Sequence, residues 1–302
     1  MTSEVTVPAA ALHEGRTTGR AARTGPAGTF VKKGLVLVGA ALAAVLFLYP
    51  LVWLISASLK PRTQVFNNEL VPDPLRAENY GRLIAGTDMS LWLVNSVVVG
   101  VAAAVAVTLS SGLVAFGFAY FRFPGRNLLF TLVLSTMMLP AAVTLIPTFL
   151  IWQELGLANT QVPLWAQNLF GSAFYIFLLR QFFLGLPRDT FEAARVDGAS
   201  FFGLFWRIAL PLVKPAMILV FVFEFRASWV DLLRPLVYLQ DSALYTVPRG
   251  LKSIIDAYGW GGEAQWEIVM AASALATLPM IVLFFLAQRH FMDGIATQGR
   301  KG

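Results

Sequence analysis

Six long apolar segments constrain the fold of this chain more than any other feature of its sequence. They cover residues 34–58, 91–119, 127–151, 162–185, 212–238 and 267–288. An apolar run of about 18 or more residues is long enough to cross the hydrocarbon core of a bilayer as a helix. The six runs therefore predict an all-α, polytopic membrane protein with six transmembrane helices.

The composition agrees with a membrane protein and excludes several kinds of chemistry. Hydrophobic residues make up 57% of the chain and charged residues only 13%, whereas soluble domains carry about 25% charged residues. There is no cysteine, and neither of the two histidines has a neighbour at metal-ligand spacing, so we expect no metal site. Basic and aromatic residues are not interleaved in one soluble patch, so nucleic acid is not an expected partner.

The polar N-terminal segment sets the domain organisation. Residues 1–32 are rich in Ala, Thr, Gly and Arg, a composition that predicts a disordered tail. The apolar run that follows is far longer than the roughly 7–15 apolar residues of a signal peptide. We therefore expect a retained first span, with residues 33–302 forming one transmembrane domain.

The distribution of basic residues predicts the orientation in the membrane. Fifteen Lys and Arg residues lie in the two tails and in the second-to-third and fourth-to-fifth connections, against six in the other loops. Basic loops remain on the cytoplasmic side. Both termini and the fourth-to-fifth connection are therefore expected in the cytoplasm.

Two spans carry residues that affect helix packing. The second has small residues four apart, at Ser111, Ala115 and Ala119, a spacing that lets helices approach closely inside a bundle. The third has Pro140 and Pro147, which each remove a backbone hydrogen bond and predict a bent helix. The bend serves either a moving pathway or packing, and the sequence leaves both open.

No catalytic grouping can be assembled from this chain. The closest string to a phosphate-binding loop is GLKS at 250–253, where Leu251 interrupts the pattern. No Ser-His-Asp arrangement or paired-carboxylate pocket is recognisable. If the protein does energy-driven work, we expect another chain to supply the energy.

The fourth-to-fifth connection contains a short charged helix. Asp189 and Glu192 have the spacing of a capping box, and Gly198 is suited to ending the helix in a left-handed conformation. An amphipathic segment follows, and Pro211 is expected to start the turn into the membrane. A helix with a tip of small residues can dock against a partner, although an interfacial linker explains its amphipathicity equally well.

The same connection carries a spaced motif that resembles the EAA motif of ABC importer membrane subunits. Its pattern, EAA-x3-G-x9-I-x-LP, is met by Glu192, Ala193, Ala194, Gly198, Ile208, Leu210 and Pro211. The wider context resembles the shorter permease of the maltose-type, carbohydrate-uptake branch, with supporting stretches from about residue 35 to the C-terminus. These include NSVVV at 95–99, MMLP at 137–140 and LYTVPRGL at 244–251. Two positions depart from the family pattern, Val230 and Gln298, and the first puts in doubt any substrate role for residue 230.

The resemblance implies a set of partners and a cytoplasmic coupling helix. The residues expected to contact the ATPase are Glu192, Ala193, Ala194, Asp197 and Gly198. In such a family this chain binds no cofactor, and ATP and Mg²⁺ are held by a cytoplasmic ATPase dimer. A second, homologous permease, membrane lipid and an extracytoplasmic solute-binding protein complete the expected partners. The binding protein is expected to face the loop at about 240–266, which alternatively forms an interfacial cap.

Charged residues in or near the fifth span are candidates for lining a path through the membrane. They are Glu224, Arg226, Asp231 and Arg234. Charges in a span are costly and usually face a partner or water. Glu224 and Asp231 are seven residues apart, which places them on one helix face, and Asp231 and Arg234 are close enough in sequence to pair. Ion pairing at a subunit interface is the alternative to lining.

The resemblance implies a permease of the bacterial cytoplasmic membrane that imports a sugar or oligosaccharide. A polyol or a glycerol-phosphate-type solute is the alternative within the same class. A membrane scaffold or receptor that binds a cytoplasmic partner without transport is the alternative from another class.

Overall fold

The computed structural model describes residues 26–260 and 262–298. The chain forms two units, divided after Leu51, which are described separately. In the first unit, helix α1 (Pro26–Ser58) begins within the segment predicted as the tail. Proline is favoured at the first position of a helix. The rest of the predicted tail, residues 1–25, lies outside the described residues.

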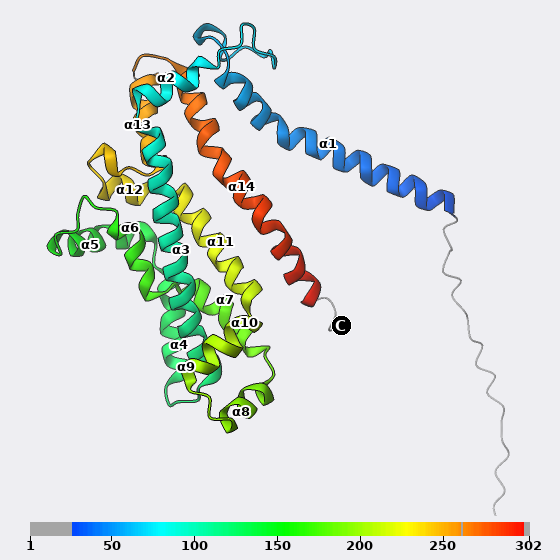
Figure 1. Ribbon diagram of the computed structural model, residues 1–302, viewed down its shortest axis with the longest axis vertical. Coiled ribbons are helices and arrows are strands. Elements are labelled where there is room, and N and C mark those ends of the chain that lie inside the picture. The colour runs from blue at the N-terminus through cyan, green and yellow to red at the C-terminus, as the bar shows by residue number, and fades with distance from the viewer. Residues whose placement is uncertain (1–25, 261, 299–302) are drawn as a thin grey trace, which may run out of the picture. The chain divides into compact units, whose positions relative to one another are not determined.

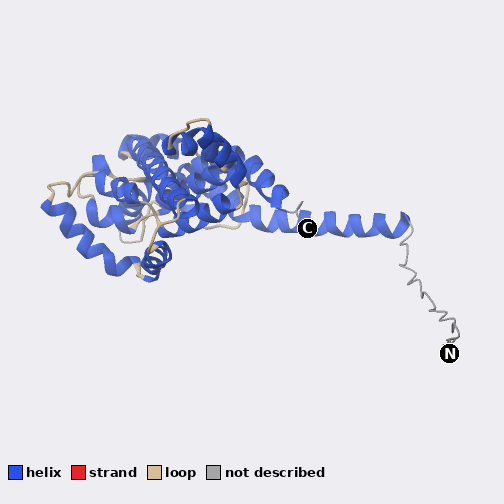
Figure 2. Cartoon of the chain, turned by 90° about the horizontal axis from the view of Figure 1, so that it is seen from below, coloured by secondary structure: helices blue, strands red, loops and turns tan. Residues whose placement is uncertain are grey.

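The described part of the second unit consists of helices and loops only (Figure 2). Its α-helices are α2 (Glu78–Gly86), α3 (Met89–Tyr120), α4 (Arg126–Ser135), α5 (Ala141–Glu154), α6 (Val162–Ala166), α7 (Ala173–Leu184), α8 (Arg188–Val196), α9 (Phe201–Leu204), α10 (Leu210–Leu212), α11 (Lys214–Val230), α12 (Leu233–Tyr238), α13 (Val247–Tyr258) and α14 (Trp266–Gln298). The predicted all-α fold is confirmed.

Helix α3 runs through the length of the second unit, with α2 and α13 at one end and α8 and α9 at the other (Figure 1). It packs mainly against α7 and α11. The small residues predicted to lie inside the bundle do so, since Ser111, Ala115 and Ala119 are all buried. A side chain added at Gly100 would meet the ring of Phe225 at 3.0 Å. Small residues thus let α11 approach α3 closely.

Three continuous helices are long and apolar enough to cross a membrane, Lys33–Ser58, Met89–Tyr120 and Trp266–Gln288. Up to six crossings result if each of three bent helix pairs forms one span. The predicted number of spans therefore agrees with the structure, but half of them are not single helices.

The third span breaks rather than curves. Residues Arg126–Met138 and Ala141–Glu154 meet at 99°. Pro140 occupies the break in an extended conformation, and Pro147 lies inside α5 without ending it. The predicted bend is confirmed, and Pro140 is the residue that causes it, because proline disfavours a helical residue before it and cannot donate to the preceding turn.

The fourth and fifth spans also differ from single helices. In the fourth, Val162–Phe170 and Ala173–Leu184 meet at 41° around Gly171, whose φ of +80° is a left-handed conformation that glycine adopts at little cost. The fifth span was predicted to cover 212–238. Its helix ends at Val230, because Asp231 is extended and Pro235 prevents a continuous helix further on.

Hydrogen bonds fix α13 and the turn before it to α3. They lie at the end of the second unit that is predicted to be extracytoplasmic. The Trp92 indole donates to the Ser242 carbonyl at 2.7 Å, and the Asn95 amide donates to the Tyr245 carbonyl at 3.0 Å. The backbone N–H of Val247 donates to the Ser96 hydroxyl at 2.7 Å. Helix α13 and the turn before it therefore form a cap fixed to the first two turns of α3.

Replacing Gly250 with alanine should destabilise this cap. The added Cβ would lie 2.1 Å from Cε3 of Trp92, so α13 must move away from α3. Overpacking of this kind costs roughly 1–3 kcal/mol, and we expect the thermal unfolding midpoint of the detergent-purified protein to fall by several degrees. Gly81→Ala is the matched control, since nothing lies within 4 Å of its added Cβ. Equal midpoints for the two variants would contradict the close approach.

Candidate functional site

Helix α8 and the two residues after it contain the residues predicted to contact an ATPase, and Gly198 ends the helix. This glycine has a φ of +88°. Its N–H donates to the Arg195 carbonyl at 3.1 Å, and the next N–H, of Ala199, donates to the Ala194 carbonyl at 2.9 Å. These two bonds form a Schellman motif, which satisfies carbonyls at the end of a helix. The prediction that Gly198 ends the helix is confirmed.

The predicted capping box at the start of α8 is wrong. Pro187 is the residue before the helix, and no side-chain oxygen caps the first turn. Asp189 lies inside the helix at its second position, whereas a capping residue must be extended and precede the helix. Its carboxylate still lies in the first turn, where negative charge interacts favourably with the helix dipole.

The two faces of α8 have different environments. Phe191 is buried with 4% of its surface exposed, and its ring packs 5.5 Å from Tyr120 and 6.1 Å from Phe116, centroid to centroid. On the opposite face Glu192 and Ala193 are exposed, and Val196 has 88% of its surface exposed. An aromatic side chain thus fixes the helix to α3 and leaves a small, partly apolar tip free for a partner.

Of the predicted contact residues, Glu192, Ala193, Asp197 and Gly198 are exposed, and Ala194 is half-buried. Arg195 stays close to its own chain, since its guanidinium lies 4.2 Å from the centre of the Phe201 ring and donates to the Ala199 carbonyl. The five predicted residues lie within the last two turns of α8 and the bend that ends it, at the end of the second unit where α8 lies (Figure 1).

The segment after α8 confirms the predicted amphipathic helix. Residues Phe201–Leu212 form one helical segment with a π-helical turn at Phe205–Ala209, and they meet α11 at 82°. Ile208 and Leu210 of the motif pack against the buried cluster around Phe116. The turn occurs at Val213 rather than at Pro211, because Pro211 occupies the first turn of α10, where proline is tolerated.

Glu224 is the buried member of the four predicted charges. Its carboxylate accepts a hydrogen bond of 2.6 Å from the side-chain amide of Asn168, and the Tyr175 hydroxyl interacts with it as well. Asn168 also donates to the Ala103 carbonyl at 3.3 Å. Through Asn168, Glu224 thus links α11 to the break in the fourth span and to α3.

The other three charges lie at the surface of this unit or near it. Asp231 and Arg234 form the predicted ion pair, and the Asp231 carboxylate also accepts the Arg234 backbone N–H at 3.3 Å. Arg226 is exposed and forms no ion pair within the described residues. Helix α11, which carries Glu224, ends at Val230, one residue before Asp231.

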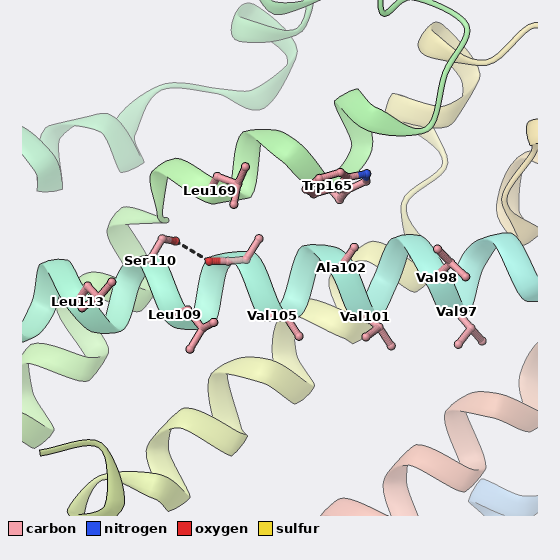
Figure 3. Close-up of a pocket in the computed structure, with 11 residues that line it drawn as sticks. Val97, Val98, Val101, Ala102, Val105, Leu109, Ser110, Leu113, Trp165 and Leu169 are labelled. Carbon is pink, nitrogen blue, oxygen red and sulfur yellow. Dashed lines mark hydrogen bonds between the residues drawn. The ribbon is translucent and has the colours of Figure 1, made fainter. Parts of the chain in front are cut away.

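An open groove along α3 offers no polar path. It has a volume of about 780 Å³ and is lined by apolar side chains of α3, with Trp165 and Leu169 on its other wall (Figure 3). Ser110 contributes a hydroxyl to the lining of the groove, and this hydroxyl already donates to the Ala106 carbonyl at 2.7 Å (Figure 3). Such a surface suits lipid or another helix, not a hydrophilic solute.

Comparison with known proteins assigns the family. Residues 96–296 match the family described as binding-protein-dependent transport system inner membrane component. The chain belongs to this family. The permease is 33% identical over 264 residues to the arabinooligosaccharides transport system permease protein AraQ of Bacillus subtilis (strain 168), covering 86% of this chain and 92% of the relative. It is 38% identical over 263 residues to the sn-glycerol-3-phosphate transport system permease protein UgpE of Yersinia pestis bv. Antiqua (strain Antiqua), covering 84% and 92%.

Solved structures share the fold of the permease. A bacterial ABC transporter involved in the import of the acidic polysaccharide alginate matches with a TM-score of 0.75 and 24% identity, covering 87% of this chain and 96% of that chain. The alginate transporter in complex with an alginate pentasaccharide-bound periplasmic protein matches with a TM-score of 0.61 and 15% identity, covering 86% and 94%. The structures support the fold, and the family match makes the permease a transport subunit of the inner membrane.

Two features of the permease were missed by sequence reasoning. Phe191 was not singled out as an anchor, although an aromatic residue beside Glu192 in an otherwise small-residue helix is a usable signal. Asn168 was given no role in the sequence analysis. Nothing in the sequence indicated that its amide bonds to Glu224, which lies 56 residues away.

Replacing Glu224 with alanine should destabilise the permease more than replacing it with glutamine. Alanine removes the acceptor of the Asn168 amide and opens a cavity, whereas the glutamine carbonyl can still accept that bond. An unsatisfied buried polar group costs about 1–3 kcal/mol. Thermal unfolding in detergent should give a lower midpoint for Glu224→Ala than for Glu224→Gln, and the reverse order would contradict the bonded arrangement.

Proposed function

We propose that this permease is one half of the membrane pathway of an ATP-driven importer of saccharides, and that α8 is the element that docks into its ATPase. The observation that carries this proposal is the geometry of α8. It combines an exposed tip ended by Gly198 with a buried anchor, Phe191, in a chain that belongs to the importer family.

The energy is supplied by other chains. ATP and Mg²⁺ are held by a cytoplasmic ATPase dimer, and this permease binds no cofactor. Closure of the ATPase displaces α8, and the displacement reaches α3 through Phe191 because its ring packs on Phe116 and Tyr120. The membrane pathway then changes between outward-facing and inward-facing states.

Two further partners complete the transporter. A second, related permease forms the other half of the pathway, and an extracytoplasmic solute-binding protein delivers the solute to the cap around α13. The alginate transporter, which shares the fold, was solved with a solute-loaded periplasmic protein. Both termini lie in the cytoplasm, a placement supported by the bias of Lys and Arg toward the loops on that side.

The solute is a sugar or oligosaccharide, as in the arabinooligosaccharide system of the relative AraQ. Glycerol phosphate is a second candidate because UgpE, a permease of an sn-glycerol-3-phosphate system, is 38% identical to this chain.

Purification from native membranes tests the assembly. Tagged permease should bring down an ATPase, a second permease and, with solute added, a binding protein. Reconstituted in vesicles, the complex should take up radiolabelled saccharide only when ATP is present on the α8 side. Recovery of a cytoplasmic protein without ATPase activity, and no uptake, would instead indicate a scaffold or receptor.

A further inference from the structure

A second hollow lies between the two broken spans of the permease. Its volume is about 550 Å³. Thr136 and Met137 line it from the break between α4 and α5, and Gln167, Asn168 and Ser172 line it from the break between α6 and α7. Unlike the groove on α3, this hollow presents hydroxyl and amide groups.

Contacts with α3 place the hollow at the depth of the membrane interior. Asn168 donates to the carbonyl of Ala103, which lies near the middle of the 32-residue α3. The backbone N–H of Ser172 donates to the hydroxyl of Ser111, two turns further along α3. The break in the fourth span therefore lies far from either end of α3, a helix long enough to span the bilayer.

Broken helices at this depth require water or protein around them. Each break leaves backbone N–H and C=O groups without partners in their own helix, and lipid cannot satisfy these groups. Many secondary transporters place such breaks where a polar solute binds near the midplane. The face that carries Thr136 and Gly171 therefore fits a hydrated pathway better than it fits lipid.

The chemistry of the hollow matches hydroxyl groups rather than anions. Within the described residues the side chains of Gln167 and Ser172 make no hydrogen bond, so each can donate and accept. The first turn of α7 adds backbone N–H donors, since Ala173 and Phe174 also line the hollow. No Lys or Arg is among the lining residues, and Glu224, which bonds to Asn168, is acidic and cannot attract an anion.

We propose that this hollow is a solute-contact site of the permease and that it takes a neutral saccharide, with Gln167, Ser172 and Thr136 binding its hydroxyl groups. The proposal rests on the importer function proposed above and narrows its solute class. The proposal assigns solute contact to uncharged side chains at the helix breaks, and not to Asp231 and Arg234, which neutralise each other.

Cysteine labelling tests the site, because the native chain contains no cysteine. Gln167→Cys and Ser172→Cys complexes in proteoliposomes should react with a charged, water-soluble methanethiosulfonate reagent. A mixture of neutral saccharides (arabinotriose, maltotriose, cellobiose and trehalose), supplied with the binding protein, should slow the reaction at least threefold, and sn-glycerol 3-phosphate should not. Val98→Cys, which is exposed in the apolar groove on α3, is the control for a thiol on an apolar surface and should stay unlabelled.

Two outcomes of the labelling experiment would overturn the proposal. Absence of labelling at both 167 and 172 overturns the hydrated pathway. Labelling that the saccharide mixture does not slow, whether or not sn-glycerol 3-phosphate slows it, overturns the neutral-saccharide assignment.

Uptake by a second pair of variants separates this inference from the importer function. Gln167→Ala should lower uptake at sub-saturating solute about three- to tenfold, the effect of one lost hydrogen bond. Gln153→Ala, exposed on α5, should behave as wild type. Normal uptake by Gln167→Ala overturns the site alone, whereas a wild-type complex without ATP-dependent uptake overturns the importer function.

Discussion

Replacing Gly198 with valine should reduce ATP-dependent uptake by more than tenfold while the permease still inserts and assembles. The glycine has a φ of +88°, and a left-handed conformation costs roughly 1–2 kcal/mol for other residues and more for a β-branched one. Valine therefore loosens the end of α8 and adds bulk to the tip that is proposed to meet the ATPase. Uptake and ATP hydrolysis measured in the same proteoliposomes would show hydrolysis that no longer depends on solute.

Gly117→Val is the matched control, since Gly117 lies in α3 with nothing within 4 Å of an added Cβ. It should transport normally. Glu192→Arg, which reverses a charge on the exposed face of α8, should uncouple in the same way as Gly198→Val. Normal uptake by both α8 variants, with the complex intact, would exclude α8 as the coupling element.

Replacing Phe191 with alanine should also uncouple transport, but by a different route. The exposed tip of α8 is unchanged, so the ATPase should still bind and hydrolyse ATP. The contacts of Phe191 with Phe116 and Tyr120 are lost, and buried Phe→Ala changes cost about 3–5 kcal/mol. Movement of α8 is then transmitted poorly to α3, and uptake per ATP hydrolysed should fall several-fold.

Phe202→Ala provides the comparison for Phe191→Ala, because Phe202 belongs to the neighbouring helix and has 70% of its surface exposed. Its ratio of uptake to hydrolysis should match wild type. If Phe191→Ala keeps the wild-type ratio in the assembled complex, α8 must transmit its movement through other contacts.

Residues whose effect is local were predicted well from the sequence. The apolar runs predicted six crossings because bilayer thickness fixes the length of a helix that spans it. Gly198 and Pro140 were placed correctly at a helix end and at a bend, since glycine and proline act on their own backbone. The pairing of Asp231 with Arg234 followed from a separation of three residues.

Features that depend on packing between distant segments could not be predicted. The capping box at Asp189 failed because Pro187 started the helix earlier than the pattern indicated. The bond from Asn168 to Glu224 requires knowledge of how two spans are placed against α3. The hollow between the broken spans likewise exists only when residues 136 and 167, which are remote in sequence, lie together.

Helix α3 has a consequence for how binding events on the two sides of the membrane affect each other. One unbroken helix of 32 residues carries the cap at Trp92 and receives Phe191 at Phe116. If the binding protein favours one position of this helix, the ATPase meets the permease in that position. Thermodynamic linkage is reciprocal, so the factor by which the binding protein raises the affinity for the ATPase equals the factor by which the ATPase raises the affinity for the binding protein.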